Sequence, residues 1–137
     1  MKTIIRYVAA SLGIFVLVGC SSEVNSAERQ VPHFRQLMTA QQYSQIYDES
    51  SDDFKNATPK RDLINLLSAV DRKLGAMKST TRTTWNVYRS TSGSFVSLVF
   101  KTQFENGAGD EMFTYRLGNG MPVLAGYHIT SNALVTQ

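Results

Sequence analysis

The sequence has 137 residues, of which 42% are hydrophobic and 18% charged, enough for one compact domain with a packed core. Its single cysteine, Cys20, excludes an internal disulfide framework and a metal site built from several cysteines. The net charge is +3, from 14 basic and 11 acidic residues; without Lys2 and Arg6, which lie in a segment that we expect to be removed, 12 basic residues remain and the charge is +1. A near-neutral domain has no electrostatic footprint for nucleic acid, so we expect no nucleic-acid partner.

Residues 1–19 are typical of a secretory signal peptide. Lys2 and Arg6 form a short positive region, and an almost unbroken apolar run follows from Tyr7 to Val18. This run is shorter than the roughly 20 apolar residues of a membrane-spanning helix, but it suits the hydrophobic region of a signal peptide. A buried N-terminal helix is the alternative; the lack of a polar stripe at helical spacing disfavours it.

Leu17-Val18-Gly19-Cys20 resembles the lipobox of bacterial lipoproteins. The resemblance implies that a lipoprotein signal peptidase recognises Leu17, Val18 and Gly19 and cuts before Cys20. It also implies that diacylglycerol is attached to the Cys20 sulfur and an acyl chain such as palmitate to the new amine, which together anchor a protein stably. Ser21, rather than Asp, at the next position implies the outer membrane, facing the periplasm. The expected location is therefore the cell envelope.

The polar segment after the cysteine lacks large aromatic residues and predicts a flexible tether. We therefore divide the chain into a signal peptide (1–19), a lipidated cysteine with its tether (20–32) and a single domain (33–137).

The first half of the domain has apolar residues at helical spacing. One group is Phe34, Leu37 and Met38, and a second is Tyr43, Ile46 and Tyr47. Between them, residues 39–42 have the form of a capping box, which predicts that one helix ends and another begins. Residues 50–53 are interpreted as a polar stop.

The next segment predicts the longest helix. Thr58 is expected as its N-cap and Pro59 as its first residue, and Gly75 is expected to end it. The positions expected to form its buried face are Leu63, Leu66, Leu67, Val70 and Leu74.

From residue 79 the apolar period changes to two, which predicts four strands separated by glycine-containing turns. The predicted strands cover residues 80–89, 94–105, 111–117 and 123–129. Inward-facing positions are expected at Val96, Leu98, Phe100 and Phe104 of the second strand and at Val123, Ala125, Tyr127 and Ile129 of the fourth. Short turns favour an antiparallel meander, and helices followed by strands indicate an α+β fold.

This domain resembles lipoproteins with the cystatin-like or nuclear-transport-factor-2-like α+β fold, in which helices fill the concave side of a curved antiparallel sheet. The matching segments, which fall within residues 34–132, are residues 43–47, 53–55, 73–75, 100–104, 111–113 and 126–129. The resemblance implies a fold rather than a chemistry, because such folds host enzymes and binding modules alike.

The residue that could carry chemistry is Glu111. Strand parity places it on the face that the helices cover, where Tyr115, Tyr127 and Trp85 could line a pocket with it. The alternative, which we favour, places Glu111 at the start of its strand, at the rim and in water. His33 and His128 lie far apart in sequence without carboxylates at ligand spacing, so no metal is expected.

Nucleotide-binding, nucleophile-elbow and zinc motifs are absent from the sequence, so we expect no cofactor. Our first hypothesis is a non-catalytic lipoprotein of the envelope that binds a protein or a small ligand. The alternative is a small-ligand enzyme that uses Glu111 as its acid or base.

Overall fold

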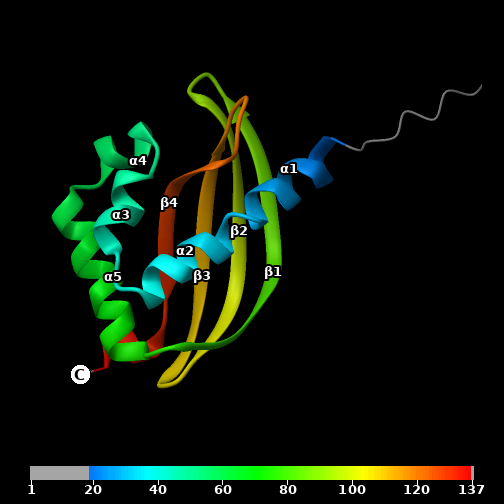
Figure 1. Cartoon of the computed structure of the whole chain (residues 1–137). Coiled ribbons are helices and arrows are strands. Elements are labelled where there is room, and N and C mark those ends of the chain that lie inside the picture. Colours follow the sequence, from blue (N-terminus) through cyan, green and yellow to red (C-terminus); the bar gives the residue numbers. More distant parts are fainter. Residues whose placement is uncertain (1–18, 137) are drawn as a thin grey trace, which may run out of the picture.

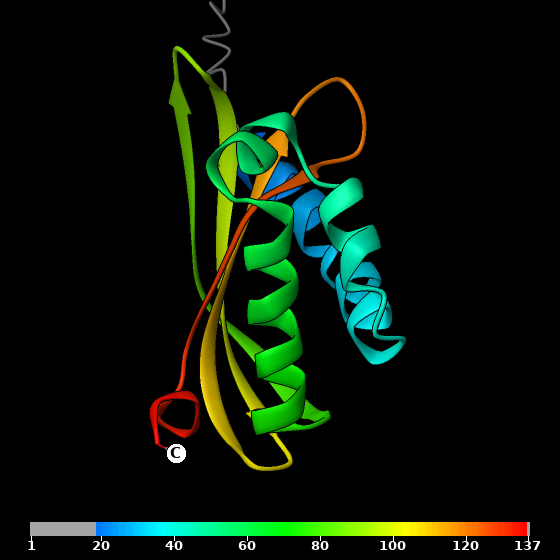
Figure 2. The same ribbon diagram turned by 90° about the vertical axis from the view of Figure 1, so that its left-hand side faces the viewer.

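A computed structural model describes residues 19–136, in which helices pack on one face of a four-stranded sheet (Figures 1 and 2). Leu17 and Val18 of the predicted lipobox lie outside the described residues. The elements are, in chain order, α1 (Gly19–Glu28), α2 (Val31–Thr39), α3 (Tyr43–Asp48), α4 (Asp52–Ala57), α5 (Lys60–Leu74), β1 (Met77–Ser90), β2 (Gly93–Phe104), β3 (Gly107–Leu117), β4 (Val123–Thr130) and α6 (Asn132–Val135).

The sheet is an antiparallel meander with the order β1-β2-β3-β4, which confirms the predicted α+β class and strand order. The register places Val96 of β2 opposite Val87 of β1 and Tyr115 of β3. Figure 2 shows the curved sheet from its edge, with helices α1 to α5 on one side of it. The second-strand residues expected to face inward are all buried in a single core with the helices.

The fourth strand differs from the prediction at its start. Thr114 pairs with Gly126, but Tyr115 pairs with Leu124, so that Ala125 is an extra residue in β4. Such a bulge reverses the alternation of the strand. Leu124 is therefore buried and Val123 is exposed, whereas Tyr127 and Ile129 face the core as predicted.

The segment expected to be a flexible tether is instead helical. It forms α1, in which Val24 is 2% exposed and Ala27 fully buried. Ion pairs of 2.6 Å between Glu28 and Arg82, and of 2.7 Å between Glu23 and Arg89, join α1 to β1. The prediction of a tether is wrong here because two small apolar residues three positions apart suffice to seat a polar helix on the sheet.

The predicted capping box is wrong, and the predicted polar stop is confirmed only in part. The Thr39 hydroxyl donates to the Arg35 carbonyl oxygen within α2, and α3 begins after Gln42 without a side-chain cap. The expected polar stop at residues 50–53 does follow the end of α3, but its last two residues begin the short helix α4, whose N-cap Ser51 accepts a hydrogen bond from the Phe54 amide. A serine three residues before a buried aromatic residue is the local signal for this short helix.

The longest predicted helix is confirmed as α5, with two differences. It begins at Lys60, so that Pro59 rather than Thr58 occupies the N-cap. Leu66 is 37% exposed, whereas the other four predicted face residues are buried. The helix ends at Gly75, where a φ of 74° favours glycine and a Cβ would lie 2.7 Å from Glu105 Oε2.

Candidate functional site

Glu111 lies in the middle of β3 and is 1% exposed, so the prediction of a solvated rim position is wrong. The strand begins at Gly107, four residues earlier than expected, because the hairpin turn is shorter than the glycine-rich sequence suggests. Glu111 is therefore flanked by Phe100 of β2 and Ile129 of β4. Its carboxylate is held between the helices and the sheet.

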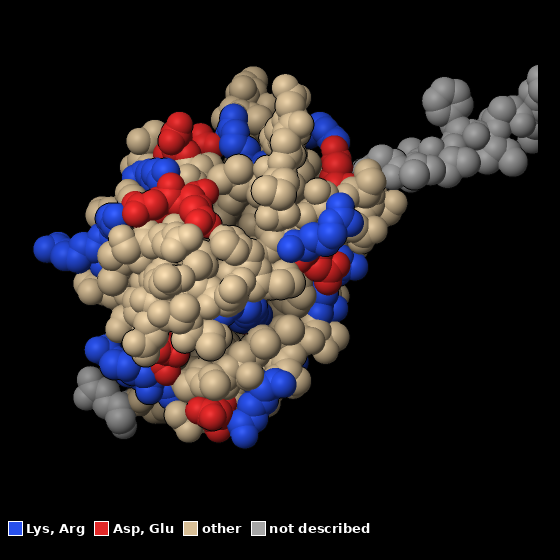
Figure 3. Space-filling view, in the orientation of Figure 1, with Lys and Arg blue, Asp and Glu red and all other residues tan. Residues whose placement is uncertain are grey.

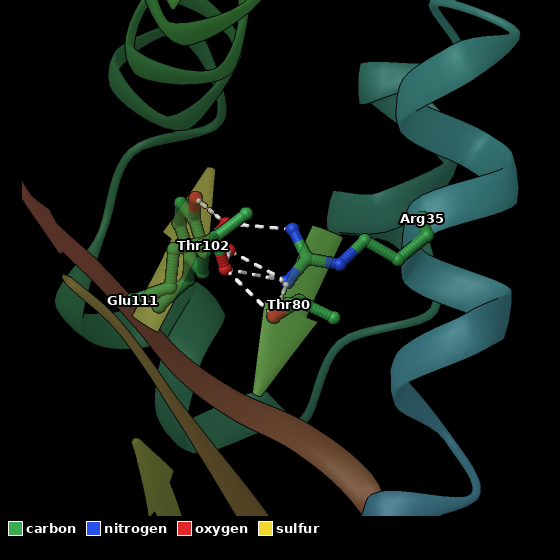
Figure 4. Close-up of polar contacts among 5 residues, drawn as sticks. Arg35, Thr80, Thr102 and Glu111 are labelled. Carbon is green, nitrogen blue, oxygen red and sulfur yellow. Dashed lines mark hydrogen bonds and ion pairs between the residues drawn. The ribbon is translucent and has the colours of Figure 1, made fainter. Parts of the chain in front are cut away.

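Arg35 of α2 compensates the charge of Glu111. Figure 4 shows its guanidinium pointing from the helix toward the strands, where Nη1 donates to Glu111 Oε1 at 2.9 Å and Nη2 lies 2.6 Å from Oε2. The hydroxyls of Thr102 and Tyr127 donate to Oε2 at 2.6 Å and to Oε1 at 2.7 Å. Nη2 of Arg35 also donates to the hydroxyl oxygens of Thr80 and Thr102, which are 2.8 Å apart. We call Arg35, Thr80, Thr102, Glu111 and Tyr127 the buried polar cluster.

These contacts use the full acceptor capacity of the Glu111 carboxylate, which is about four lone-pair sites. Burial, together with the charge and hydrogen bond of Glu111, raises the pKa of Tyr127 well above its ordinary value. Tyr127 therefore stays a neutral donor at physiological pH. An acid or base at Glu111 would first have to give up one of these partners.

The four residues predicted to line one pocket are not brought together. Glu111 and Tyr127 belong to the buried polar cluster, and Tyr115 lies further along β3. Trp85, on the edge strand β1, is 46% exposed and lines neither of the two cavities that border the helix α2.

The larger of these cavities, of about 520 Å³, lies between α2, α3 and the start of β4. Its walls are mostly apolar, and two exposed residues of the β3–β4 connection, Met121 and Val123, stand at its edge. The lining residues that are buried are Phe34, Leu37, Ile46, Tyr115, Pro122 and Leu124. Figure 3 shows acidic and basic side chains interspersed around an uncharged area on this face of the molecule.

Among the buried residues that line the larger cavity, Tyr115 is the one with a polar group, and 2% of its surface is exposed. Within residues 19–136 its hydroxyl has no hydrogen-bond partner. Burial raises the pKa of Tyr115 above its ordinary range, against the opposing effect of the Arg35 charge. The hydroxyl therefore remains a neutral donor whose bonding capacity is unused.

A polar pair stands at the edge of the larger cavity. His33 Nε2 of α2 lies 2.6 Å from Glu49 Oε2, and Gln45 donates to Glu49 Oε1 at 2.7 Å. The hydrogen bond from Gln45, and then the one from His33, lower the pKa of Glu49. No sequence pattern relates His33 to Glu49, because 16 residues separate them and only the packing of α2 against α3 brings them together.

A second cavity, of about 360 Å³, lies between α2 and the end of α5. Arg35 and Glu111 lie in its wall. Asp71 also lines it and accepts hydrogen bonds from Tyr43 and Gln41. Every carboxylate of this cavity is thus already paired within the described part of the chain.

A comparison with family models places this fold in a family. Residues 31–127 match the model described as "Protein of unknown function (DUF4019)". The chain belongs to this family. The match covers α2 to most of β4 and so includes the buried polar cluster, the second cavity and every lining residue of the larger cavity except Gln30. No curated protein matches the chain.

Residues 19–136 contain no group of three or more His, Cys, Asp or Glu side chains placed to hold a metal ion. No helix in that range is long and apolar enough to cross a membrane.

Proposed function

We propose that this protein is a lipid-anchored lipoprotein of the bacterial cell envelope whose domain binds a small apolar ligand without catalysing a reaction. The observation that carries the binding role is the larger cavity. Its volume of about 520 Å³ lies within the range of small-molecule sites, which is roughly 300–1,000 Å³. Apolar walls with few polar groups are also typical of such sites.

The buried polar cluster supports a non-catalytic domain. A general acid or base must reach the proton that it moves, but Arg35, Thr102 and Tyr127 occupy the Glu111 carboxylate. A buried carboxylate paired in this way holds α2 on β3. The enzyme alternative would need a ligand that displaces one of these partners.

The lipobox-like sequence before Ser21 supports the anchor. If Cys20 carries the lipid, α1 begins at the membrane, because Cys20 is its second residue. A ten-residue helix is about 15 Å long, so the larger cavity, whose wall begins at Gln30, lies close to the bilayer surface. We therefore propose that the domain works at the membrane and, given Ser21, on the periplasmic side of the outer membrane. A further partner in the envelope is compatible with this location.

The anchor is tested by labelling with an alkyne analogue of palmitate in the native host. Wild-type protein is expected to incorporate the label and to be recovered with outer membranes, whereas Cys20→Ala is expected to remain an unprocessed, unlabelled precursor. Ser21→Asp is the matched control, because it keeps the acylated cysteine and changes only the sorting position. An unmodified Cys20 in the intact mass of the wild-type protein would overturn the proposal.

A further inference from the structure

The loop between β3 and β4, residues 118–122, is an exposed and uncharged part of the surface. Residues 117–127 of the sequence include no acidic or basic side chain. Met121 is 76% exposed and Val123 is 38% exposed, so two large apolar side chains face solvent at the edge of the larger cavity. A Cβ added at either glycine of the loop would meet no atom of residues 19–136 within 4 Å, and Figure 2 shows the loop arching away from the sheet. Exposed apolar groups that adjoin an apolar cavity indicate an apolar partner.

The position of this loop beside α1 indicates which apolar partner it meets. Ser22 of α1 lines a shallow depression together with Gly118 and Pro122 of the loop. Pro122 also lines the larger cavity, so the loop borders both the depression and the cavity. Ser22 is two residues after Cys20, the proposed site of the lipid. If Cys20 is acylated, the loop and the edge of the larger cavity lie beside the end of α1 that is held at the bilayer.

The charges around the loop suit a phospholipid surface. Arg29, directly after α1, is exposed and lines the same depression as the loop. Basic side chains close to a membrane are attracted to anionic lipid headgroups. Glu23, which also lines this depression, is paired with Arg89 at 2.7 Å, and Glu49 at the edge of the larger cavity is paired with His33. An uncharged loop with a basic residue beside it therefore fits the boundary between headgroups and acyl chains.

We infer that the β3–β4 loop docks on the bilayer that holds the anchor, with Met121 among the acyl chains, and that the larger cavity takes the acyl chain of a membrane lipid as its ligand. This inference rests on the proposed function and narrows it to one ligand class. Phe34, Ile46 and Leu124 would surround the chain. The buried residues of the wall that the structure describes carry no charge, which suits a chain that needs no polar partner.

Spin labelling measures the depth of the loop in the bilayer. Met121→Cys is made in the full chain, purified as acylated protein from native-host membranes and placed in vesicles of phosphatidylethanolamine and phosphatidylglycerol. Residue 121 then carries the single reactive thiol, because Cys20, the one cysteine of the sequence, is blocked by its lipid. A nitroxide at residue 121 is expected to collide often with oxygen, which concentrates among acyl chains, and rarely with a water-soluble nickel complex.

Met77→Cys is the matched control for depth. Met77 is also an exposed methionine, with 41% of its surface accessible, but it begins β1. Figure 1 shows the start of β1 at the lower end of the sheet and the β3–β4 loop at the upper end. A nitroxide at residue 77 is therefore expected to collide readily with the nickel complex.

The ligand is tested in the same vesicles with a phosphatidylethanolamine that carries a diazirine at the end of one acyl chain. Illumination is expected to attach this photolipid to the peptides of α2 and α3 that line the larger cavity. Met121→Asp should reduce this labelling about tenfold, because the bilayer no longer buries a large apolar side chain. Met77→Asp should leave the labelling unchanged. Limited proteolysis during heating verifies that both variants keep the wild-type thermal midpoint, as expected for substitutions at exposed residues.

The remaining outcomes separate this inference from the proposed function. A nitroxide at residue 121 that the nickel complex reaches, or that is shielded from both reagents as under a protein lid, would overturn docking of the loop. Equal losses of labelling in Met121→Asp and Met77→Asp would overturn it as well. Labelling of the cavity peptides by a free alkyl diazirine but not by the photolipid would overturn the lipid as ligand, while the binding function stands. If neither reagent labels these peptides, the binding function is overturned, and an unmodified Cys20 in the intact mass overturns the anchor.

Discussion

At the residue scale, the central feature is the ion pair between Arg35 and Glu111. The Arg35 side chain is 14% exposed and that of Glu111 1%, so water screens their attraction little. Pairing two buried charges adds less stability than the short distance suggests, because both groups lose their hydration. Removing one partner, however, leaves the other charge buried and unpaired, which is strongly destabilising. The pair therefore contributes most to specifying how α2 sits on the sheet.

Arg35→Met is expected to destabilise the protein by about 3–5 kcal/mol, because it leaves the Glu111 carboxylate buried without its cation. Lys101→Met is the matched control, because its partner Asp110 neighbours Glu111 but both side chains of this pair are more than half exposed. Such exposed pairs contribute about 0–1 kcal/mol. Urea denaturation of both variants measures the difference, and equal stabilities would contradict a structural role for the buried pair.

The second residue-scale prediction concerns the pKa of Glu49. Hydrogen bonds from Gln45 and His33 lower this pKa in the folded protein, so folding is favoured at pH values above the unfolded value of about 4.3. That contribution is lost as the pH falls through the lower, folded pKa. Carboxyl-detected NMR titration should give a depressed midpoint in wild type that rises in Gln45→Ala and, to a smaller extent, in His33→Ala. An unchanged midpoint in both variants would show that these contacts do not form.

At the element scale, α5 offers a comparison between adjacent leucines. Leu67 is fully buried, whereas Leu66 is 37% exposed. Leu67→Ala is expected to cost about 2–5 kcal/mol, because it removes buried methyl groups and leaves a cavity. Leu66→Ala should stay within about 1 kcal/mol of wild type, since much of this side chain already contacts water. Thermal or urea unfolding measures the loss of stability in each variant. A larger loss for Leu66→Ala than for Leu67→Ala would mean that α5 is rotated relative to the sheet.

At the scale of the whole molecule, α1 lies outside the segment that the family model matches, yet it belongs to the core. Its Val24 and Ala27 are buried, and its two glutamates pair with arginines of β1. In Figure 1 the helix crosses the strands beside α2. Removing α1 would therefore uncover apolar surface on the sheet.

A chain that begins at residue 31 is expected to be less stable than one that begins at residue 21 by at least about 2 kcal/mol, the value of burying one valine-sized side chain. The variant Val24→Ser within the longer chain should reproduce part of the loss. Thermal unfolding of the three proteins checks this prediction. Equal midpoints for the two chain lengths would restore the interpretation of residues 21–30 as a tether.

The sequence by itself determined the order of three domain helices and the four strands, but not the helices α1, α4 and α6. Helical spacing located α2, α3 and α5, and the change to a period of two located β1 to β4. Each of these patterns shows which face of a single element is buried and which is exposed to solvent. The same local logic placed Glu111 on the covered face of its strand.

Tertiary structure decided which of these residues meet. Arg35 and Glu111 are 76 residues apart, and His33 and Glu49 are 16 apart, so no local period relates them. The bulge at Ala125 reversed the start of β4 through its pairing with β3. The larger cavity is the space that α2, α3 and β4 leave between them. A cavity depends on the fit of side chains from distant segments, whereas a sequence pattern records only whether each segment has a face to bury.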